Sequence, residues 1–214
     1  VTVVRGKGHN METFGISGKG PRSVAAADLN GDGILDLATA NVFSSTLSLW
    51  LSEEKKPLAK DVELEVPARA IFVAAADFDG DADADLVVAG GVDAVWLLRN
   101  GGDAQFEAPI SLHAGKFVNF VVFADLDGDD APEIIATSAN DSQEHVTLFH
   151  NRGKGELSTP VHLTGAPPAA GCVAFDIDGD RDLDLVGTAR TANYQVTTRL
   201  WVARNEGQGQ VPAV

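Results

Sequence analysis

The chain has 214 residues, a net charge of −15 and one cysteine. It has no run near the roughly 20 apolar residues that a membrane helix needs, and its acidic balance offers neither a basic stripe for nucleic-acid phosphates nor attraction to an anionic membrane. Cys172 cannot form an internal disulfide, and the small apolar run around it predicts a buried thiol rather than a nucleophile.

An acidic motif, D-x-[D/N]-G-D-x-x-x-[D/E], recurs four times, and the starts of its copies are 49, 48 and 51 residues apart. The copies are DLNGDGILDL at 28–37, DFDGDADADL at 77–86, DLDGDDAPEI at 125–134 and DIDGDRDLDL at 176–185. Their first, third, fifth and ninth positions hold 15 carboxylates, a number equal to the net negative charge. Repetition at a nearly fixed period predicts one array of similar units.

Each unit is predicted to hold four strands. A run of small apolar residues precedes the motif, a second apolar run follows it, a third carries an aromatic residue and usually ends in a Gly-rich turn, and a weaker fourth leads onward. No stretch has a sustained helical period, so we expect an all-β fold, a β-propeller of four-stranded antiparallel blades. The third runs carry aromatic residues that we expect at one equivalent core position: Trp50, Trp96, Phe149 and Trp201.

The units form one predicted propeller domain or propeller segment over residues 1–214, with a partial N-terminal unit. Their approximate ranges are 1–20 (partial), 21–66, 67–115, 116–165 and 166–214. Residues 1–8 match a third strand and its turn, 12–17 would be a fourth strand, and the last unit stops about where its fourth strand should form, at 211–214. The start without Met or a signal peptide fits a mature form or a fragment.

Two interpretations of these ends stay open. The N-terminal strand could complete the last blade of a small ring, or the chain could be an ordered part of a larger propeller. We favour the second, because closure needs one donated strand and two are offered. Exposed blade edges would then be expected to associate with other chains.

The acidic motifs are predicted metal sites. Side chains at positions one, three, five and nine can converge while Gly at position four permits the tight turn. A set of hard oxygens without His or Cys favours Ca²⁺, which tolerates irregular geometry better than Mg²⁺ does. An EF-hand is excluded, because its Gly is sixth and its last acid twelfth. Solvated acidic turns are the alternative, but four copies in register argue against them.

The predicted side-chain ligands of up to four Ca²⁺ ions are Asp28, Asn30, Asp32 and Asp36; Asp77, Asp79, Asp81 and Asp85; Asp125, Asp127, Asp129 and Glu133; and Asp176, Asp178, Asp180 and Asp184. The backbone carbonyl at position seven is expected to add a ligand: Ile34, Asp83, Ala131 and Asp182. The side chains of Asp83 and Asp182 should then point to solvent. We expect the sites with Asn30 and Glu133 to bind differently, and their occupancy stays open.

These motifs resemble the calcium loops of FG-GAP/VCBS-type repeats, the blades of integrin α-subunit propellers and of many secreted bacterial proteins and lectins. The likeness covers essentially the whole chain. The N-x-G-x-G turns make it closer to the bacterial VCBS-like variety, since the Phe-Gly and Gly-Ala-Pro signatures are largely missing. The resemblance implies that the loop joins the first two strands of a blade and holds calcium as a structural ion, so it assigns stability to these residues and no ligand.

No catalytic constellation is predicted. The five histidines have no metal-ligand spacing, and no G-x-S-x-G, phosphate-loop or zinc motif occurs. The segments that break the repeat are better candidates for a binding surface, because variable loops often carry function. They are 41–45, 138–145 and 191–195, and the last includes Tyr194, the only tyrosine.

We therefore expect a calcium-stabilised propeller, secreted, extracellular or periplasmic, that acts as a binding or assembly module for other protein chains or glycans. It is not expected to bind nucleic acid or to insert into a membrane, and an enzymatic role is less favoured. The alternatives are a non-catalytic or partial portion of an extracellular polysaccharide-active enzyme, or a structural subunit of a large complex.

Overall fold

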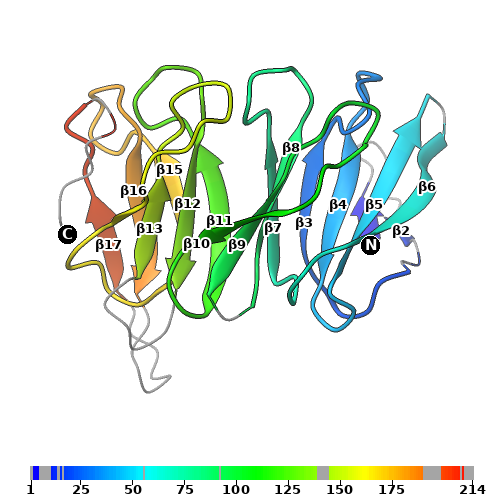
Figure 1. The fold of residues 1–214 in the computed structure, drawn as a ribbon, viewed down its shortest axis with the longest axis horizontal. Helices are drawn as coiled ribbons and strands as arrows, with labels where there is room; N and C mark the ends of the chain where they lie inside the picture. Colours follow the sequence, from blue (N-terminus) through cyan, green and yellow to red (C-terminus); the bar gives the residue numbers. More distant parts are fainter. Residues whose placement is uncertain are drawn as a thin grey trace.

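The computed structural model describes residues 2–4, 11–13, 15, 17–54, 56–91, 93–138, 145–189, 199–207 and 209. All regular structure among them is β-strand (Figure 1). The described residues include no helix of the length and apolarity that would cross a membrane. The chain is therefore all-β, as its sequence predicts.

Each sheet is antiparallel and is built from strands that are consecutive in the sequence. The first blade comprises β3 (Pro21–Ala27), β4 (Asp36–Asn41), β5 (Thr46–Glu53) and β6 (Lys56–Glu65). The second comprises β7 (Phe72–Ala76), β8 (Asp85–Ala89), β9 (Ala94–Leu98) and β10 (Ile110–His113). The third comprises β11 (Val118–Ala124), β12 (Glu133–Ser138), β13 (Val146–Phe149) and β14 (Val161–His162).

The fourth blade has three strands within the described residues: β15 (Ala169–Phe175), β16 (Asp184–Ala189) and β17 (Leu200–Ala203). The predicted fourth strand at 211–214 lies outside the described residues. A separate hairpin pairs β1 (Thr2–Val4) with β2 (Met11–Thr13). The extent of the domain and its unit boundaries stay predictions.

The blades stand side by side in an arc. The first strands of successive blades, β3, β7, β11 and β15, contact one another, so they form the inner side of the arc. The first and fourth blades lie at opposite ends of the long axis (Figure 1). Within the described residues, therefore, the arrangement is that of a propeller that does not close on itself.

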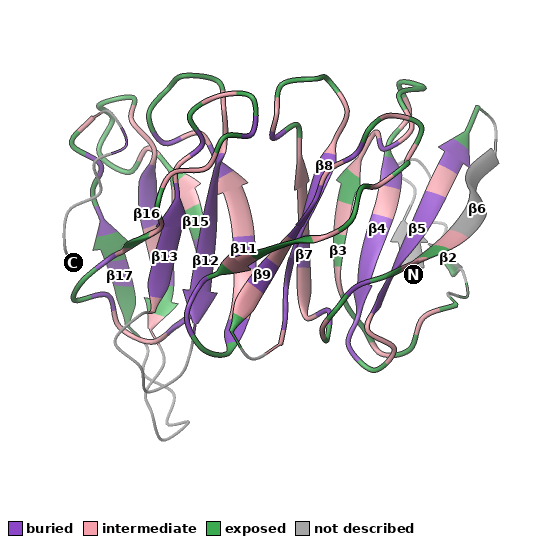
Figure 2. Ribbon diagram, viewed as in Figure 1, coloured by how far each residue is buried: buried purple, intermediate pink, exposed green. Residues whose placement is uncertain are grey.

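The hydrophobic core lies between the blades rather than within them. Apolar residues lie on both faces of the second and third blades, so one face packs on the preceding blade and the other on the following blade. Three clusters result, centred on Leu47, Val88 and Leu98 between blades one and two, on Val87, Leu97 and Ile134 between two and three, and on Ile135, Leu148 and Leu185 between three and four. Figure 2 shows the strands β12 and β13 as buried.

The aromatic residues of the third strands share a face but not a register. Trp96, Phe149 and Trp201 pack on the core shared with the preceding blade, which confirms their packing role. Trp50 pairs with Leu37, whose equivalent in the fourth blade is Leu185. Trp201 instead pairs with Gly187, two residues further along the second strand.

The expectation of one equivalent position is therefore wrong. The reason is visible in the sequence. Trp96 and Trp201 stand four residues before the Asn of the Gly-rich turn (Asn100 and Asn205), whereas Phe149 stands two residues before Asn151.

Candidate metal centres

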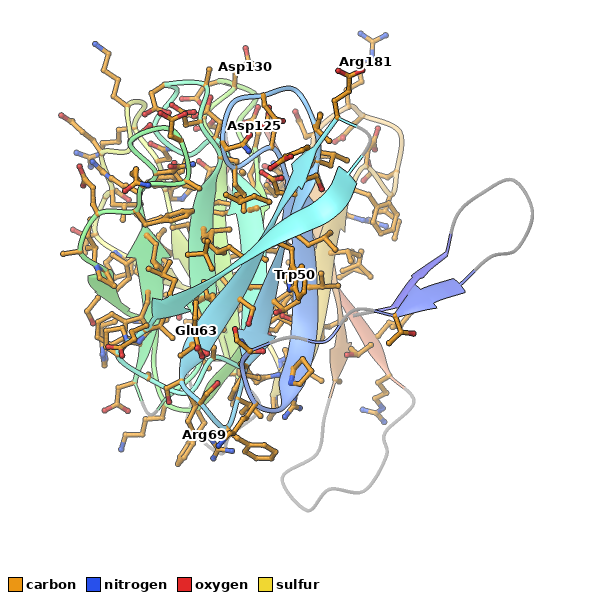
Figure 3. All side chains as sticks on the ribbon, turned by 90° about the vertical axis from the view of Figure 1, so that its right-hand side faces the viewer. Trp50, Glu63, Arg69, Asp125, Asp130 and Arg181 are labelled. Carbon is orange, nitrogen blue, oxygen red and sulfur yellow. The ribbon has the colours of Figure 1, made fainter. Side chains whose placement is uncertain are left out.

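The four acidic loops lie at the same end of their sheets. Each joins the first and second strands of a blade, and because the first strands run side by side in one direction, their loops collect together. Figure 3 shows Asp125, Asp130 and Arg181 at this end of the sheets and Arg69 at the opposite end.

Each loop is closed by its own carboxylates. In the second loop Asp77 accepts main-chain hydrogen bonds from Gly80 (2.8 Å) and Ala82 (3.0 Å). Asp81 accepts one from Asp83 at 2.9 Å. The same bonds recur in the other loops, where the first-position acids are Asp28, Asp125 and Asp176, and the fifth-position acids are Asp32, Asp129 and Asp180. The carboxylates are therefore oriented by the backbone.

Two positions of each loop have left-handed backbone. Position four is always Gly, as in Gly80 with φ of 77°. Position six is also left-handed, but only the first loop has glycine there, and the others have Ala82 (φ 76°), Asp130 (φ 68°) and Arg181 (φ 83°). A non-glycine residue in this region costs on the order of 1 kcal/mol or more. The sequence pattern gave no sign of this second strained position.

Three loops bring together three of the four side chains that the motif predicts as ligands. In each of them, carboxylate oxygens from positions one, three and nine lie within 4.8 Å of one another. The groups are Asp77, Asp79 and Asp85; Asp125, Asp127 and Glu133; and Asp176, Asp178 and Asp184. The fifth-position acids are not in these groups, and the first loop, which has Asn30 at position three, forms no such group among its described acids.

The ninth-position acid is fully buried and ties the loop to the end of the third strand. Asp85 accepts hydrogen bonds from Phe78 N (2.9 Å) and from Asn100 N (2.7 Å). Burial raises the pKa of Asp85 to about 6. Asp36 and Asp184 make the same pair of contacts in their loops.

Glu133 departs from this pattern. Its Oε2 accepts a hydrogen bond from Leu126 N at 2.7 Å. Its Oε1 is buried, accepts no hydrogen bond from the described residues, and lies 3.9 Å from His150 Nδ1. The Glu133 carboxylate raises the pKa of His150.

The donor set fits a hard cation. Asp79 Oδ1, like Glu133 Oε1, is a buried carboxylate oxygen with no hydrogen-bond donor among the described residues. Burial, followed by the charge of Asp81, raises the pKa of Asp79, and burial together with Glu133 does the same for Asp127. Clustered carboxylates that are desolvated and repel one another are what a bound Ca²⁺ would neutralise.

Comparison with known families identifies the repeat. A model described as FG-GAP-like repeat matches residues 77–136 and 132–187, and one described as FG-GAP repeat matches 20–45. The chain belongs to the FG-GAP repeat family. No curated protein matches it in sequence.

Solved structures share the propeller fold of this FG-GAP chain. An Agrocybe aegerita lectin, described as recognising non-reducing terminal N-acetylglucosamine, has 18% identity and a TM-score of 0.56 over 88% of this chain and 51% of its own. BBS1N in complex with ARL6DN has 12% identity and a TM-score of 0.56 over 87% and 54%. The V. cholerae biofilm matrix protein Bap1 has 17% identity and a TM-score of 0.52 over 88% and 27%. The chain thus spans about half the length of the first two, and identities this low show the fold alone.

The FG-GAP loops are connected between blades by an asparagine that the sequence analysis did not single out. Asn100, 1% exposed, donates through Nδ2 to the carbonyl of Ala84 (3.2 Å) in its own blade and to that of Leu29 (2.8 Å) in the preceding loop. Asn151 and Asn205 make the equivalent pair of bonds. We call these residues the turn asparagines. The N-x-G spacing was visible in the sequence, but not the loop that the amide reaches.

A basic side chain precedes each turn asparagine and lies at an acidic loop. Arg204 Nε is 3.6 Å from Asp178 Oδ2, and the charge of Arg99 acts on Asp79. His150 takes this place in the third FG-GAP loop, beside Glu133. The third loop thus differs from the other two, in which an Arg partly offsets the charge of the acids.

Other predicted positions have mixed outcomes. The side chains of Asp83 and Asp182 are half-buried rather than free in solvent, because each lies beside a glycine of the turn that follows the third strand. The carbonyl ligands at position seven stay a prediction.

Cys172 is buried, and burial raises its pKa to about 12. Of the candidate binding loops, 41–45 is described, whereas 139–144 and 190–198, with Tyr194, lie outside the described residues.

Proposed function

We propose that this chain is a calcium-stabilised extracellular or periplasmic propeller module that binds or assembles with other molecules. The observation that carries the proposal is the convergence of acids from positions one, three and nine in three loops. In two of these loops a buried carboxylate oxygen, of Asp79 or Glu133, has no donor among the described residues. Bound calcium would supply the positive charge that these carboxylates lack.

The ninth-position acid links such binding to the fold. Asp85 holds both its own loop, through Phe78 N, and the end of the third strand, through Asn100 N. The amide of Asn100 in turn reaches the preceding loop. A filled site would therefore stabilise the contact between two blades, and the faces of the arc would depend on the ion for their rigidity.

Thermal melting in EDTA and in millimolar Ca²⁺ tests the calcium proposal. At 100 times the dissociation constant, one site adds about 2.7 kcal/mol, which for a domain of this size is roughly 5–10 °C in melting temperature. The variant Asp79→Asn should lose part of this shift. Asp93→Asn, an exposed acid outside the motifs, is the matched control. A melting temperature that changes with neither EDTA nor Ca²⁺ would contradict the assignment of these loops as calcium sites.

A protein or carbohydrate is the proposed ligand class. The fold is shared with a lectin and with a biofilm matrix protein, which supports a binding role without naming a ligand. The described candidate loop, 41–45, exposes 74% of Phe43. Glycan-array binding that is lost in Phe43→Ala and retained in Phe117→Ala, another exposed aromatic, would support a carbohydrate ligand. Absence of binding to every glycan would leave the protein-assembly role as the proposal.

A further inference from the structure

The fourth blade ends in an apolar face that nothing described covers. We call the face of a blade that is turned to the following blade its back face, and the opposite one its front face. In the second blade the back face includes Phe78, Val87, Val95 and Leu97, each 0–1% exposed against the third blade. The strand pairing identifies the equivalent residues of the fourth blade as Ile177, Val186, Leu200 and Val202.

These equivalents are apolar but exposed. Ile177 is 43%, Leu200 72% and Val202 37% exposed, and on β15 the same face adds Val173 at 55% and Phe175 at 42%. Exposed residues alternate with buried ones along β17, whereas β12 and β13 are buried throughout (Figure 2). A contiguous apolar sheet face of this kind marks an interaction site. The back face of the fourth blade is also apolar like the back faces of the first three blades, which are packed on the blades that follow them.

The polar contacts between blades are incomplete at the same place. The carbonyls of Leu29, Phe78 and Leu126 each accept a hydrogen bond from the turn asparagine of the next blade. No described residue fills this role for Ile177, their counterpart. Arg204 at the fourth loop is also 67% exposed, whereas Arg99 at the second loop donates to Gly155 O of the next blade at 2.6 Å.

The first blade carries the complementary half of this interface. On its front face Val24 is 55% exposed, whereas its equivalents Val73, Val121 and Cys172 are 1%, 0% and 4% exposed against the preceding blades. Residues 17–20 of the same chain cover the outer part of this face, where Gly18 N donates to Ser48 Oγ at 3.3 Å. The open part is the inner strand, around Val24.

We propose that the back face of the fourth blade docks on the front face of the first blade of a second copy of this chain. The described residues repeat this face-to-face contact three times and leave one uncovered half in the first blade and one in the fourth. Head-to-tail contacts close into a ring when the rotation permits, and two arcs of four blades would give eight, within the usual range of roughly four to eight for propellers. The inference gives the assembly role proposed above a surface and a partner, and it does not require calcium binding.

Sedimentation velocity of the 214-residue protein in saturating Ca²⁺ tests the proposal. We expect a species of about twice the 22.4 kDa chain mass. Leu200→Lys and Val24→Lys should each weaken the dimer at least about tenfold, because each places a charge in an apolar contact. Phe117→Lys, which removes an equally exposed apolar side chain from the third blade, should leave it unchanged.

A mixture separates head-to-tail docking from other modes. Leu200→Lys retains an intact front face and Val24→Lys an intact back face, so mixing them should restore a dimer through one interface. A wild-type monomer at high concentration would overturn the proposal and leave the face to another partner. Loss of the dimer in Leu200→Lys but not in Val24→Lys would indicate back-to-back pairing and would also overturn it. Melting with and without Ca²⁺ reports on the metal separately, so either proposal can fail alone.

Discussion

Replacing Asn100 by Ala should destabilise the protein far more than a surface asparagine would. The amide donates to Leu29 O at 2.8 Å and to Ala84 O at 3.2 Å, and Oδ1 accepts from Gly102 N at 3.2 Å. Each buried hydrogen bond contributes about 1 kcal/mol net, and the partners that lose it stay buried. We therefore expect a loss of about 3 kcal/mol, or roughly 6–12 °C in melting temperature.

Urea unfolding followed by tryptophan fluorescence, in Ca²⁺ and in EDTA, measures this loss. Asn119→Ala is the control, because Asn119 also connects two blades by an amide-to-carbonyl bond, to Ala170 O at 2.9 Å, but this bond is exposed to solvent. The Asn119→Ala substitution should lower the free energy of unfolding by less than about 1 kcal/mol. Equal losses in the two variants would refute the idea that the turn asparagines hold the blades together.

Four further results are expected. Burial raises the pKa of Asp85 to about 6, above the ordinary 3.8 of the unfolded chain, so the calcium-free protein should gain stability as pH falls from 6 towards 4, on the order of 3 kcal/mol from this group. Calcium affinity, measured by calorimetry, should fall over the same pH range, since the proton and the ion compete; an affinity independent of pH would argue against Asp85 as a ligand. Gly187→Ala should cost about 2 kcal/mol or more in urea, because its Cβ would lie 2.3 Å from the Trp201 ring, whereas Gly101→Ala, with its nearest neighbour at 3.7 Å, should be nearly neutral. Cys172, buried with a pKa of about 12, should react with a thiol reagent at pH 8 only at the rate of unfolding, and rapid labelling of the native protein would contradict its packing between blades.

Local sequence patterns predicted the blades and most of the loop geometry. The spacing of the acidic motif encoded the closure of each loop, because the bonds of Asp77 and Asp81 span only two to five residues. The burial of Asp85 was not predictable, since it depends on a third strand 15 residues away.

The turn asparagines show the same limit at longer range. Asn100 reaches a carbonyl 71 residues away, and no local pattern states which blade lies beside it. The aromatic register failed for a related reason, because the aromatic residue can shift by two positions and still face the same core.

The placement of the acidic loops gives the molecule an asymmetric charge distribution. The motifs hold 15 carboxylates, as many as the net negative charge, and all four loops lie at the same end of their sheets. Outside them, acids and bases balance. A polyanion, such as an acidic polysaccharide or a phospholipid surface, would repel the loop end and allow approach only by the opposite end, where 42–45 lies. Each bound divalent cation would weaken that field, so calcium concentration would set not only how firmly the blades hold but also how strongly the molecule is oriented.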